Sequence, residues 1–258
     1  MAIDSRMFCD ETGHDFVAPA ARRRRQIAVK ILSMRAAANM KGPLLRDRGY
    51  LPHLEARGAT YFLTLRLADT LPFALLHQIR VELSELKRHF EERKLNALEE
   101  QRLKYLQTKR VQDYLDTGAG ACWFKQPVIA ELVQEAVRHH EAESYITHAC
   151  CIMPNHLHWI LTPLRKKGMN KNDSRIILIV QRFKSYTAHV ANKVLQRSGS
   201  FWAREYYDHL IRDSEQFGRL VRYTLENPVK AKLCKHWNEW KWTICSESIK
   251  EAFFLEIG

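Results

Sequence analysis

The sequence predicts an α+β protein built on a ferredoxin-like antiparallel sheet with helices on one face. Three observations favour this fold. Segments with strand-like and helix-like periodicity follow one another in the order β-α-β-β-α-β and are followed by a final helix. Hydrophobic residues make up 46% of the 258 residues, enough for a packed core. No apolar run is long enough to span a membrane.

The first half of the chain contains one predicted strand and several predicted helices. A strand is expected over 59–67, where apolar side chains alternate with others. Two charged amphipathic helices are expected over 73–96 and 98–114, and a helix with an early proline over 127–143. We interpret the helical material at about 73–120 as an insertion, either a DNA-contact subdomain or a packing extension.

The second half completes the predicted sheet. Strands are expected over 146–153, 156–162 and 201–212, and helices over 174–196 and 214–227. The first two of these strands are joined by a tight Pro-Asn turn, so residues at the start of the second strand lie at an end of the sheet.

Two histidines open the strand at 156–162. Successive side chains of a strand point to opposite faces, so His156 and His158 share one face while Leu157 and Trp159 share the other. Two imidazoles on one rigid strand can clamp a metal ion. The alternative is that both are polar residues on the solvated face of a half-buried strand.

The helix predicted at 214–227 carries a tyrosine and an asparagine one turn apart. Ser214 is in a suitable position for an N-cap, and apolar residues recur at spacings of three and four. Tyr223 and Asn227 lie at i and i+4, so they share a face, and Pro228 is expected to end the helix. The alternative is a surface tyrosine and an asparagine that only stops the helix.

The charge of the chain favours a polyanionic partner. Lys and Arg outnumber Asp and Glu by 41 to 29, which gives a formal charge of +12. Nucleic acid fits best, and an acidic membrane surface is the alternative. The first 15 residues contain acids and no apolar stretch, so a signal peptide is not expected. The six cysteines form no C-x-x-C pair, which favours reduced thiols in a cytoplasmic protein.

Several motifs in order resemble those of the REP-associated tyrosine transposases, a branch of the single-tyrosine HUH transposases of bacterial insertion sequences. The likeness spans about 48–233 and implies the HUH endonuclease fold for that range. Flanking it we expect a basic N-terminal extension over 1–47, with four arginines at 22–25, and a Trp-rich C-terminal extension over 234–258. The motifs that carry the likeness are Arg48–His53, Thr60–Leu67, Met153–His158, Gln181–Ala188, Phe201–Asp213 and Tyr223–Ala231.

The resemblance implies a metal-dependent endonuclease and strand transferase that acts on single-stranded DNA at palindromic hairpin repeats. It implies that Tyr223 is the nucleophile and forms a covalent phosphotyrosine. It also implies that His156, His158 and Asn227 bind a divalent cation, Mg²⁺ or Mn²⁺. Tyr186, Tyr206 and Tyr207 compete for the nucleophile role, but only Tyr223 combines the motif match with an amide one turn later.

Other residues are candidates for substrate contact. His209 is a candidate for contact with the metal or the scissile phosphate, with a structural histidine as the alternative. Basic side chains expected at DNA phosphates, with a solvated surface as the alternative, are Arg182, Lys184, Arg204, Arg212, Arg222 and Lys230.

Two other functions remain open from the sequence. One is a catalytically inactive protein that binds DNA or RNA hairpins, and the other is a metal-dependent hydrolase, for which the chain lacks a clear carboxylate cluster. The sequence is compatible with a monomer or a homodimer, and with an active site assembled within one chain or between two.

Overall fold

The computed structural model describes residues 44–47, 52–55, 58–93, 96, 98–99, 102, 106, 110–164 and 175–254. The basic run at 22–25 lies outside these residues, so the prediction for it is not addressed. The boundaries expected at 47/48 and 233/234 remain predictions.

The centre of the molecule is a five-stranded sheet in the order β6-β3-β5-β4-β7, in which every neighbouring pair is antiparallel. The α+β class is therefore confirmed, and the four strands expected from the sequence take the order of a ferredoxin-like sheet. A separate two-stranded sheet joins β1 and β2. The strands are β1 (Leu44–Asp47), β2 (Pro52–Glu55), β3 (Thr60–Arg66), β4 (Tyr145–Met153), β5 (His156–Pro163), β6 (Tyr207–Ile211) and β7 (Thr243–Cys245).

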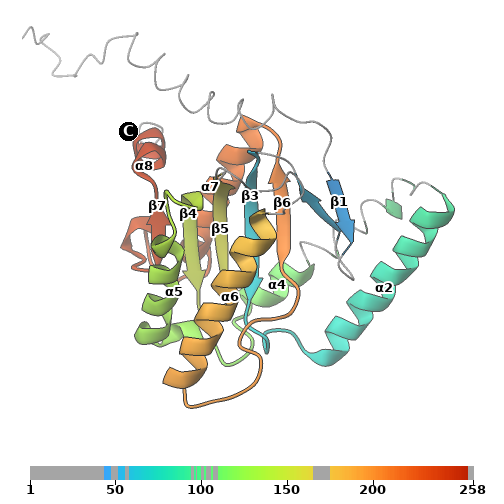
Figure 1. Ribbon diagram of the computed structural model, residues 1–258, viewed down its shortest axis with the longest axis horizontal. Helices are drawn as coiled ribbons and strands as arrows, with labels where there is room; N and C mark the ends of the chain where they lie inside the picture. Colours follow the sequence, from blue (N-terminus) through green and yellow to red (C-terminus); the bar gives the residue numbers. More distant parts are fainter. Residues whose placement is uncertain are drawn as a thin grey trace, which may run out of the picture.

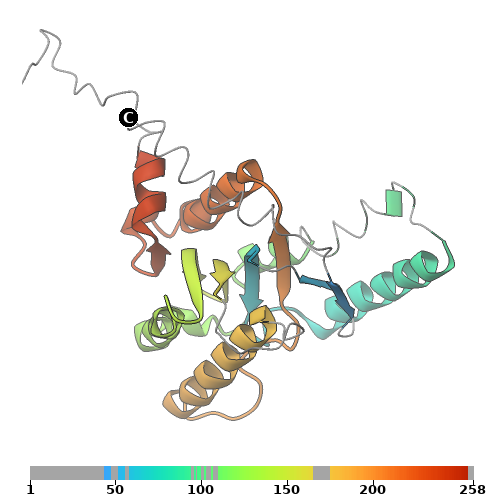
Figure 2. The ribbon, with the colours of Figure 1, turned by 45° about the horizontal axis from the view of Figure 1, so that its top comes forward.

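Helices cover the sheet in two groups. The helices α5 (Pro127–His139) and α6 (Arg175–Val194) lie side by side on one face, as the ferredoxin-like plan requires (Figures 1 and 2). The helix α7 (Ser214–Lys230) lies on the opposite face together with the last helix, α8 (Glu247–Phe254). No helix among the described residues has the length and apolar character needed to cross a membrane.

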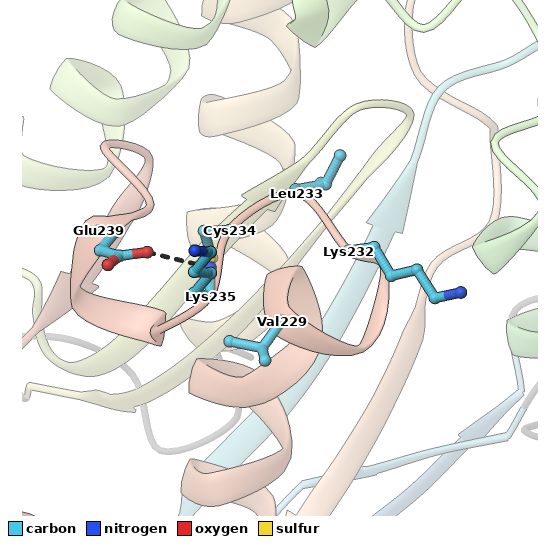
Figure 3. A pocket seen from close by; sticks show the side chains of 6 residues that line it. All are labelled: Val229, Lys232, Leu233, Cys234, Lys235 and Glu239. Atoms are coloured by element: carbon cyan, nitrogen blue, oxygen red, sulfur yellow. Dashed lines mark hydrogen bonds between the residues drawn. The ribbon is translucent and has the colours of Figure 1, made fainter.

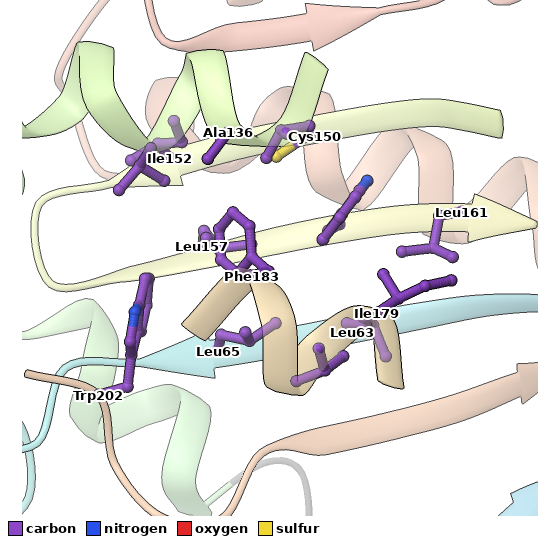
Figure 4. Close-up of a cluster of buried hydrophobic side chains, with 14 of the residues drawn as sticks. Leu63, Leu65, Ala136, Cys150, Ile152, Leu157, Leu161, Ile179, Phe183 and Trp202 are labelled. Carbon is purple, nitrogen blue, oxygen red and sulfur yellow. The ribbon is translucent and has the colours of Figure 1, made fainter. Parts of the chain in front are cut away.

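Strand alternation divides the buried side chains into two clusters. On β5, Leu157, Trp159 and Leu161 face α5 and α6 in the larger cluster (Figure 4). Ile160, between them, faces α7 in the smaller cluster, as does Phe62 of β3. Trp159 is fully buried, and its indole Nε1 donates to Thr147 Oγ1 at 3.1 Å, so its one polar atom is satisfied.

The predicted insertion contains α2 (Phe73–Glu92) and α4 (Arg110–Asp116). In Figure 1, α2 projects away from the central sheet. Its buried stripe, Ile79, Leu83 and Leu86, packs with Leu106 in a cluster of its own. Of the helix expected over 98–114, only the end is described as a continuous helix, and α4 extends two residues past the expected boundary.

The start of β6 differs from the prediction. The strand expected over 201–212 is regular only over Tyr207–Ile211. Residues 201–203 still bridge to the end of β3, since Ala203 N donates to Arg66 O at 2.9 Å and Ala68 N donates to Phe201 O at 3.0 Å. The ladder is interrupted after Ala203, where the Lys184 ammonium donates to the carbonyl oxygens of Ala203 and Arg204. Phe201 and Trp202 are buried, and Trp202 Nε1 donates to Thr187 Oγ1 at 2.8 Å.

The ends of α7 also differ from the predictions. Its N-cap is Asp213 instead of Ser214, because the Asp213 carboxylate accepts from Gln216 N at 2.7 Å. Pro228 does not end the helix. Proline removes one N–H donor, but the next turn still closes, since Ala231 N donates to Asn227 O at 3.0 Å.

The C-terminal extension packs against the sheet. Trp240 Nε1 donates to Ile152 O at 3.0 Å, and Trp242 is buried beside the larger cluster. Strand β7 then pairs with β4 through Thr243–Cys245. Trp240 and Trp242 therefore pack the C-terminal extension onto the core.

His148 ties α7 to the sheet at a register shift in β4, between Thr147 and Ala149. Its Nε2 lies 2.8 Å from Thr162 Oγ1, and its ring meets the Phe217 ring edge-on at 5.3 Å. Burial lowers the pKa of His148 to about 4, so the folded protein holds a neutral imidazole there.

We predict that Asp213→Ala lowers the free energy of unfolding by about 1 kcal/mol, because it removes the α7 N-cap. Ser214→Ala is the matched control and should change the value by less than about 0.5 kcal/mol. Urea unfolding followed by circular dichroism measures both variants. An equal loss in the two would show that the cap is assigned to the wrong residue.

We predict that acid destabilises the fold partly through His148. As the pH falls from about 6.5 towards 4, the unfolded chain takes up a proton at this imidazole and the folded chain does not, so stability is lost over that window. A His148→Gln variant should therefore show a pH slope smaller by about 1.4 kcal/mol per pH unit. Urea titrations at several pH values between 4.5 and 7 test this, and an unchanged slope would contradict it.

Candidate catalytic site

The two histidines of β5 lie side by side under α7. Arg66 and Thr64 of β3 pair with His156 and His158, respectively, in the sheet register. As the strand alternation predicts, both rings project from the face of the sheet opposite to Leu157 and Trp159. They are buried, not solvated, with exposed fractions of 1% for His156 and 0% for His158. The Nε2 atoms of the two rings are 3.1 Å apart.

The outer nitrogen of each ring has its own partner. His156 Nδ1 lies 2.7 Å from Asn155 Oδ1, and His158 Nδ1 lies 3.0 Å from Thr64 Oγ1. Burial lowers the pKa of His156 to about 3 and that of His158 well below its ordinary value. Both imidazoles are therefore neutral at neutral pH, which is the form that can bind a metal ion.

Tyr223 of the same chain lies against this pair. Its ring centroid is 5.1 Å from that of His158 at an interplanar angle of 65°, and 5.9 Å from that of Phe62. The helix α7 presents Tyr223 here because its apolar stripe, including Val221 and Leu225, packs on the same face of the sheet. The structure thus brings Tyr223 and both histidines together within one chain.

The surroundings of Tyr223 hold its phenol in the protonated form. Burial raises the pKa of Tyr223, and the nearby Asp116 carboxylate raises it further. A hydrogen bond with Asn227 acts in the opposite direction and lowers the pKa. The ammonium of Lys230 lies 5.5 Å from the centre of the tyrosine ring and is a positive charge close to the phenol.

Asn227 is buried, at 4% exposure, one helical turn after Tyr223. Its hydrogen bond with Tyr223 places the amide beside the candidate nucleophile. Among the described residues, no three side chains of His, Cys, Asp or Glu gather as a metal site. Asn227 is the third ligand predicted from the sequence, and its side chain would offer an amide.

The basic candidates fall into different parts of the molecule. Arg182 is exposed and Lys184 is half-buried on α6, which covers the face opposite to α7. The Lys184 ammonium donates to the carbonyl oxygens of Ala203 at 2.6 Å and Arg204 at 2.9 Å, and burial lowers its pKa to about 8. The structure therefore does not bring these two residues to the histidine pair.

The remaining basic candidates are exposed. Arg204 lies before β6 and Arg212 directly after it. Arg222 and Lys230 are on α7, adjacent to Tyr223 and two turns beyond it. Lys230 also lies 3.6 Å from Glu226 in an i,i+4 ion pair.

His209 and the competing tyrosines lie outside the pair. His209 Nε2 is 2.7 Å from Gln216 Nε2, so His209 connects β6 to the first turn of α7. Tyr207 stacks over His209 with centroids 6.3 Å apart. Tyr186 is 56% exposed on α6. Tyr223, by contrast, makes a ring contact with His158.

The sequence did not identify Asn155 and Thr64 as the hydrogen-bond partners of the two histidines. Asn155 directly precedes the first histidine, and this position in the turn was the available signal. Thr64 is on another strand and is identified only by the register that pairs it with His158.

A surface hollow lies at the end of α7 (Figure 3). Within it, the backbone N–H of Lys235 donates to Glu239 Oε2 at 3.0 Å. It includes none of the histidine and tyrosine residues described above. Its lining consists of Val229, Lys232, Leu233, Cys234, Lys235 and Glu239.

Comparison with known proteins finds two similar chains from Haemophilus influenzae. One, provisionally named a REP-associated tyrosine transposase, is 24% identical over 119 residues, which cover 43% of this chain and 64% of the relative. The other, an uncharacterised protein, is 34% identical over 98 residues, which cover 30% of this chain and 51% of the relative. The chain thus spans less than two thirds of the length of either relative. No protein-family model matches it.

A solved structure of a REP-associated tyrosine transposase bound to a REP hairpin aligns over 77% of this chain and 80% of its own, with 18% identity and a TM-score of 0.36. This overlap is too loose to support a conclusion about function. The sequence comparison agrees with the motifs, and the chain is similar to a REP-associated tyrosine transposase.

Proposed function

We propose that this chain is a metal-dependent transposase that nicks and rejoins single-stranded DNA at palindromic hairpins through a covalent bond to Tyr223. The observation that carries the proposal is the placement of the Tyr223 ring 5.1 Å from the His158 ring, beside a second buried neutral imidazole. A nucleophile beside two nitrogens that can bind a metal ion is an arrangement that supports metal-assisted phosphodiester transfer to a tyrosine.

In the proposed reaction, Tyr223 Oη attacks the phosphorus of the scissile linkage. The bond between phosphorus and the 3′ oxygen breaks, and a phosphotyrosine ester and a free 3′ hydroxyl are formed. The phenol proton is lost to water or a base during attack, and the departing oxygen takes up a proton. Rejoining reverses these steps with a 3′ hydroxyl as the nucleophile. Because an ester bond is kept throughout, no nucleotide cofactor is consumed.

The histidine pair fits a divalent cation. Two nitrogens bound to one ion at about 2.1 Å and at right angles would be about 3.0 Å apart, close to the 3.1 Å between the Nε2 atoms. His156, His158 and Asn227 would hold the ion, for which we propose Mg²⁺ or Mn²⁺; the imidazole nitrogens favour Mn²⁺ of the two. When bound, the cation would polarise the scissile phosphate and stabilise negative charge on the leaving oxygen.

The environment of the phenol shapes the chemistry. Since burial raises the pKa of Tyr223, the resting phenol is protonated and must lose its proton during attack. The Lys230 ammonium beside the ring would favour the phenoxide that forms. Because both histidines are buried, a phosphate can reach them only when the side chains above them move.

The substrate class is proposed from the net charge of +12 and from the likeness to a REP-associated tyrosine transposase. Single-stranded DNA with a hairpin stem is a polyanion, as the positive charge favours, and is the substrate class that the likeness suggests. Arg222 and Lys230, exposed on α7 next to the nucleophile, are the basic candidates best placed to contact its phosphates.

We predict that Tyr223→Phe abolishes covalent capture of a labelled single-stranded DNA hairpin but leaves binding within about threefold of wild type, since only the attacking oxygen is removed. The substrates are single-stranded hairpins made from palindromic sequences sought in the DNA around the gene, and they are incubated with Mn²⁺ and resolved by denaturing electrophoresis. Tyr207→Phe is the matched control and should retain the adduct.

An adduct of wild-type strength from Tyr223→Phe would reject Tyr223 as the nucleophile. Hairpin binding without an adduct from the wild-type chain would favour the alternative function, a catalytically inactive hairpin-binding protein.

We predict that His158→Gln weakens Mn²⁺ binding by more than about 10-fold, because it removes a direct ligand. His209→Gln should bind Mn²⁺ as the wild type does, because His209 hydrogen-bonds Gln216 at the first turn of α7. Calorimetry on the DNA-free proteins measures both affinities, and chelation should end adduct formation by the wild type. Equal losses in the two variants would contradict the assigned ligand set.

A further inference from the structure

Asn155 lies where the helical insertion meets the histidine pair. It is in the turn between β4 and β5, at 1% exposure, and its backbone oxygen accepts from Leu67 N at 2.9 Å. Its side-chain Nδ2 donates to Leu115 O at 3.1 Å and to Ala119 O at 2.9 Å. Both carbonyls belong to the segment that ends the insertion, namely the last turn of α4 and the loop after it.

These bonds set the orientation of the amide. A carbonyl oxygen only accepts hydrogen bonds, so the atom that contacts Leu115 O and Ala119 O must be the NH₂ group. The Oδ1 atom is therefore the one that faces His156 Nδ1, at 2.7 Å. Because an amide oxygen cannot donate, His156 Nδ1 must carry the ring proton, and Nε2 keeps a bare lone pair on the side of His158.

His158 is held differently. Its Nδ1 faces the hydroxyl of Thr64 at 3.0 Å, and a hydroxyl can donate or accept. His158 can therefore place its proton on Nε2 and donate to His156 across the 3.1 Å gap, or place it on Nδ1 and donate to Thr64. One ring of the pair has a fixed tautomer and the other can change.

We propose that Asn155 is a positioning residue that holds His156 in the Nδ1–H tautomer, and that the end of the helical insertion sets the orientation of Asn155. The insertion thereby prepares the metal-binding nitrogen of His156 in the free protein. The benefit to metal binding rests on the function proposed above, whereas the tautomer itself does not. A residue of this kind typically contributes 10- to 100-fold in metal affinity.

The test reads the tautomer directly in the metal-free protein. With ¹⁵N-labelled histidine, long-range ¹H–¹⁵N correlation at pH 7.5 should show wild-type His156 protonated at Nδ1 alone. Asn155→Ala should populate the Nε2–H form of His156. Asn155→Asp should retain the Nδ1–H form, because a carboxylate still accepts from Nδ1. Thr64→Ala is the matched control, and it should leave His156 unchanged.

Mn²⁺ calorimetry on the same proteins provides the second readout. Asn155→Ala should bind Mn²⁺ about 10- to 100-fold more weakly than wild type, and Asn155→Asp should bind more tightly than Asn155→Ala. Because Asn155→Asp loses the bonds to Leu115 and Ala119 as well, its rescue separates the effect on His156 from a general loss of packing.

Two outcomes would overturn the inference: wild-type His156 protonated at Nε2, or Asn155→Ala with His156 still protonated at Nδ1 alone. Neither outcome bears on covalent capture by Tyr223, so this inference and the proposed function fail separately.

Discussion

The candidate site depends on the burial of two neutral imidazoles whose four nitrogens all have partners. Taking an imidazole out of water is costly unless its polar atoms are hydrogen-bonded. Here Asn155 and Thr64 satisfy the outer nitrogens, and the two Nε2 atoms face each other. Burial then keeps both rings uncharged. The pair is therefore stable in the fold, and its neutral form is the one that the proposed cation would require.

The two-residue alternation of side chains along β5 allows a buried histidine pair and a packed apolar core on the same strand. Leu157 and Trp159 lie in the cluster under α5 and α6, while His156 and His158 project from the opposite face of the sheet. A one-residue slip in register would exchange the two sets, placing polar rings in the apolar cluster. The packing that stabilises the sheet therefore also selects the face on which the candidate chemistry occurs.

The helix α7 packs on the sheet and also carries the proposed nucleophile. Val221 and Leu225 anchor it to the sheet, and the same helical turns carry Tyr223 to His158 and Asn227 to Tyr223. Its apolar stripe fixes the helix rotation, and the rotation fixes where the phenol points. Continuation of the helix through Pro228 keeps Lys230 on the turn that overlies the tyrosine ring.

The sequence by itself determined the α+β class, the strand order, the shared face of His156 and His158 and the pairing of Tyr223 with Asn227 on one helix face. These follow from local periodicity and from the motif likeness, which need no knowledge of distant contacts. Its errors, at the ends of β6 and α7, arose where packing or a neighbouring cap outweighed the local signal.

Only the tertiary structure decided how deeply the imidazoles are buried and which groups satisfy them. Thr64 reaches His158 through strand register, and the carbonyls of Leu115 and Ala119 reach Asn155 across 40 and 36 residues of sequence. The physical reason is that hydrogen bonds between distant segments depend on how whole elements pack, and local periodicity carries no record of that packing.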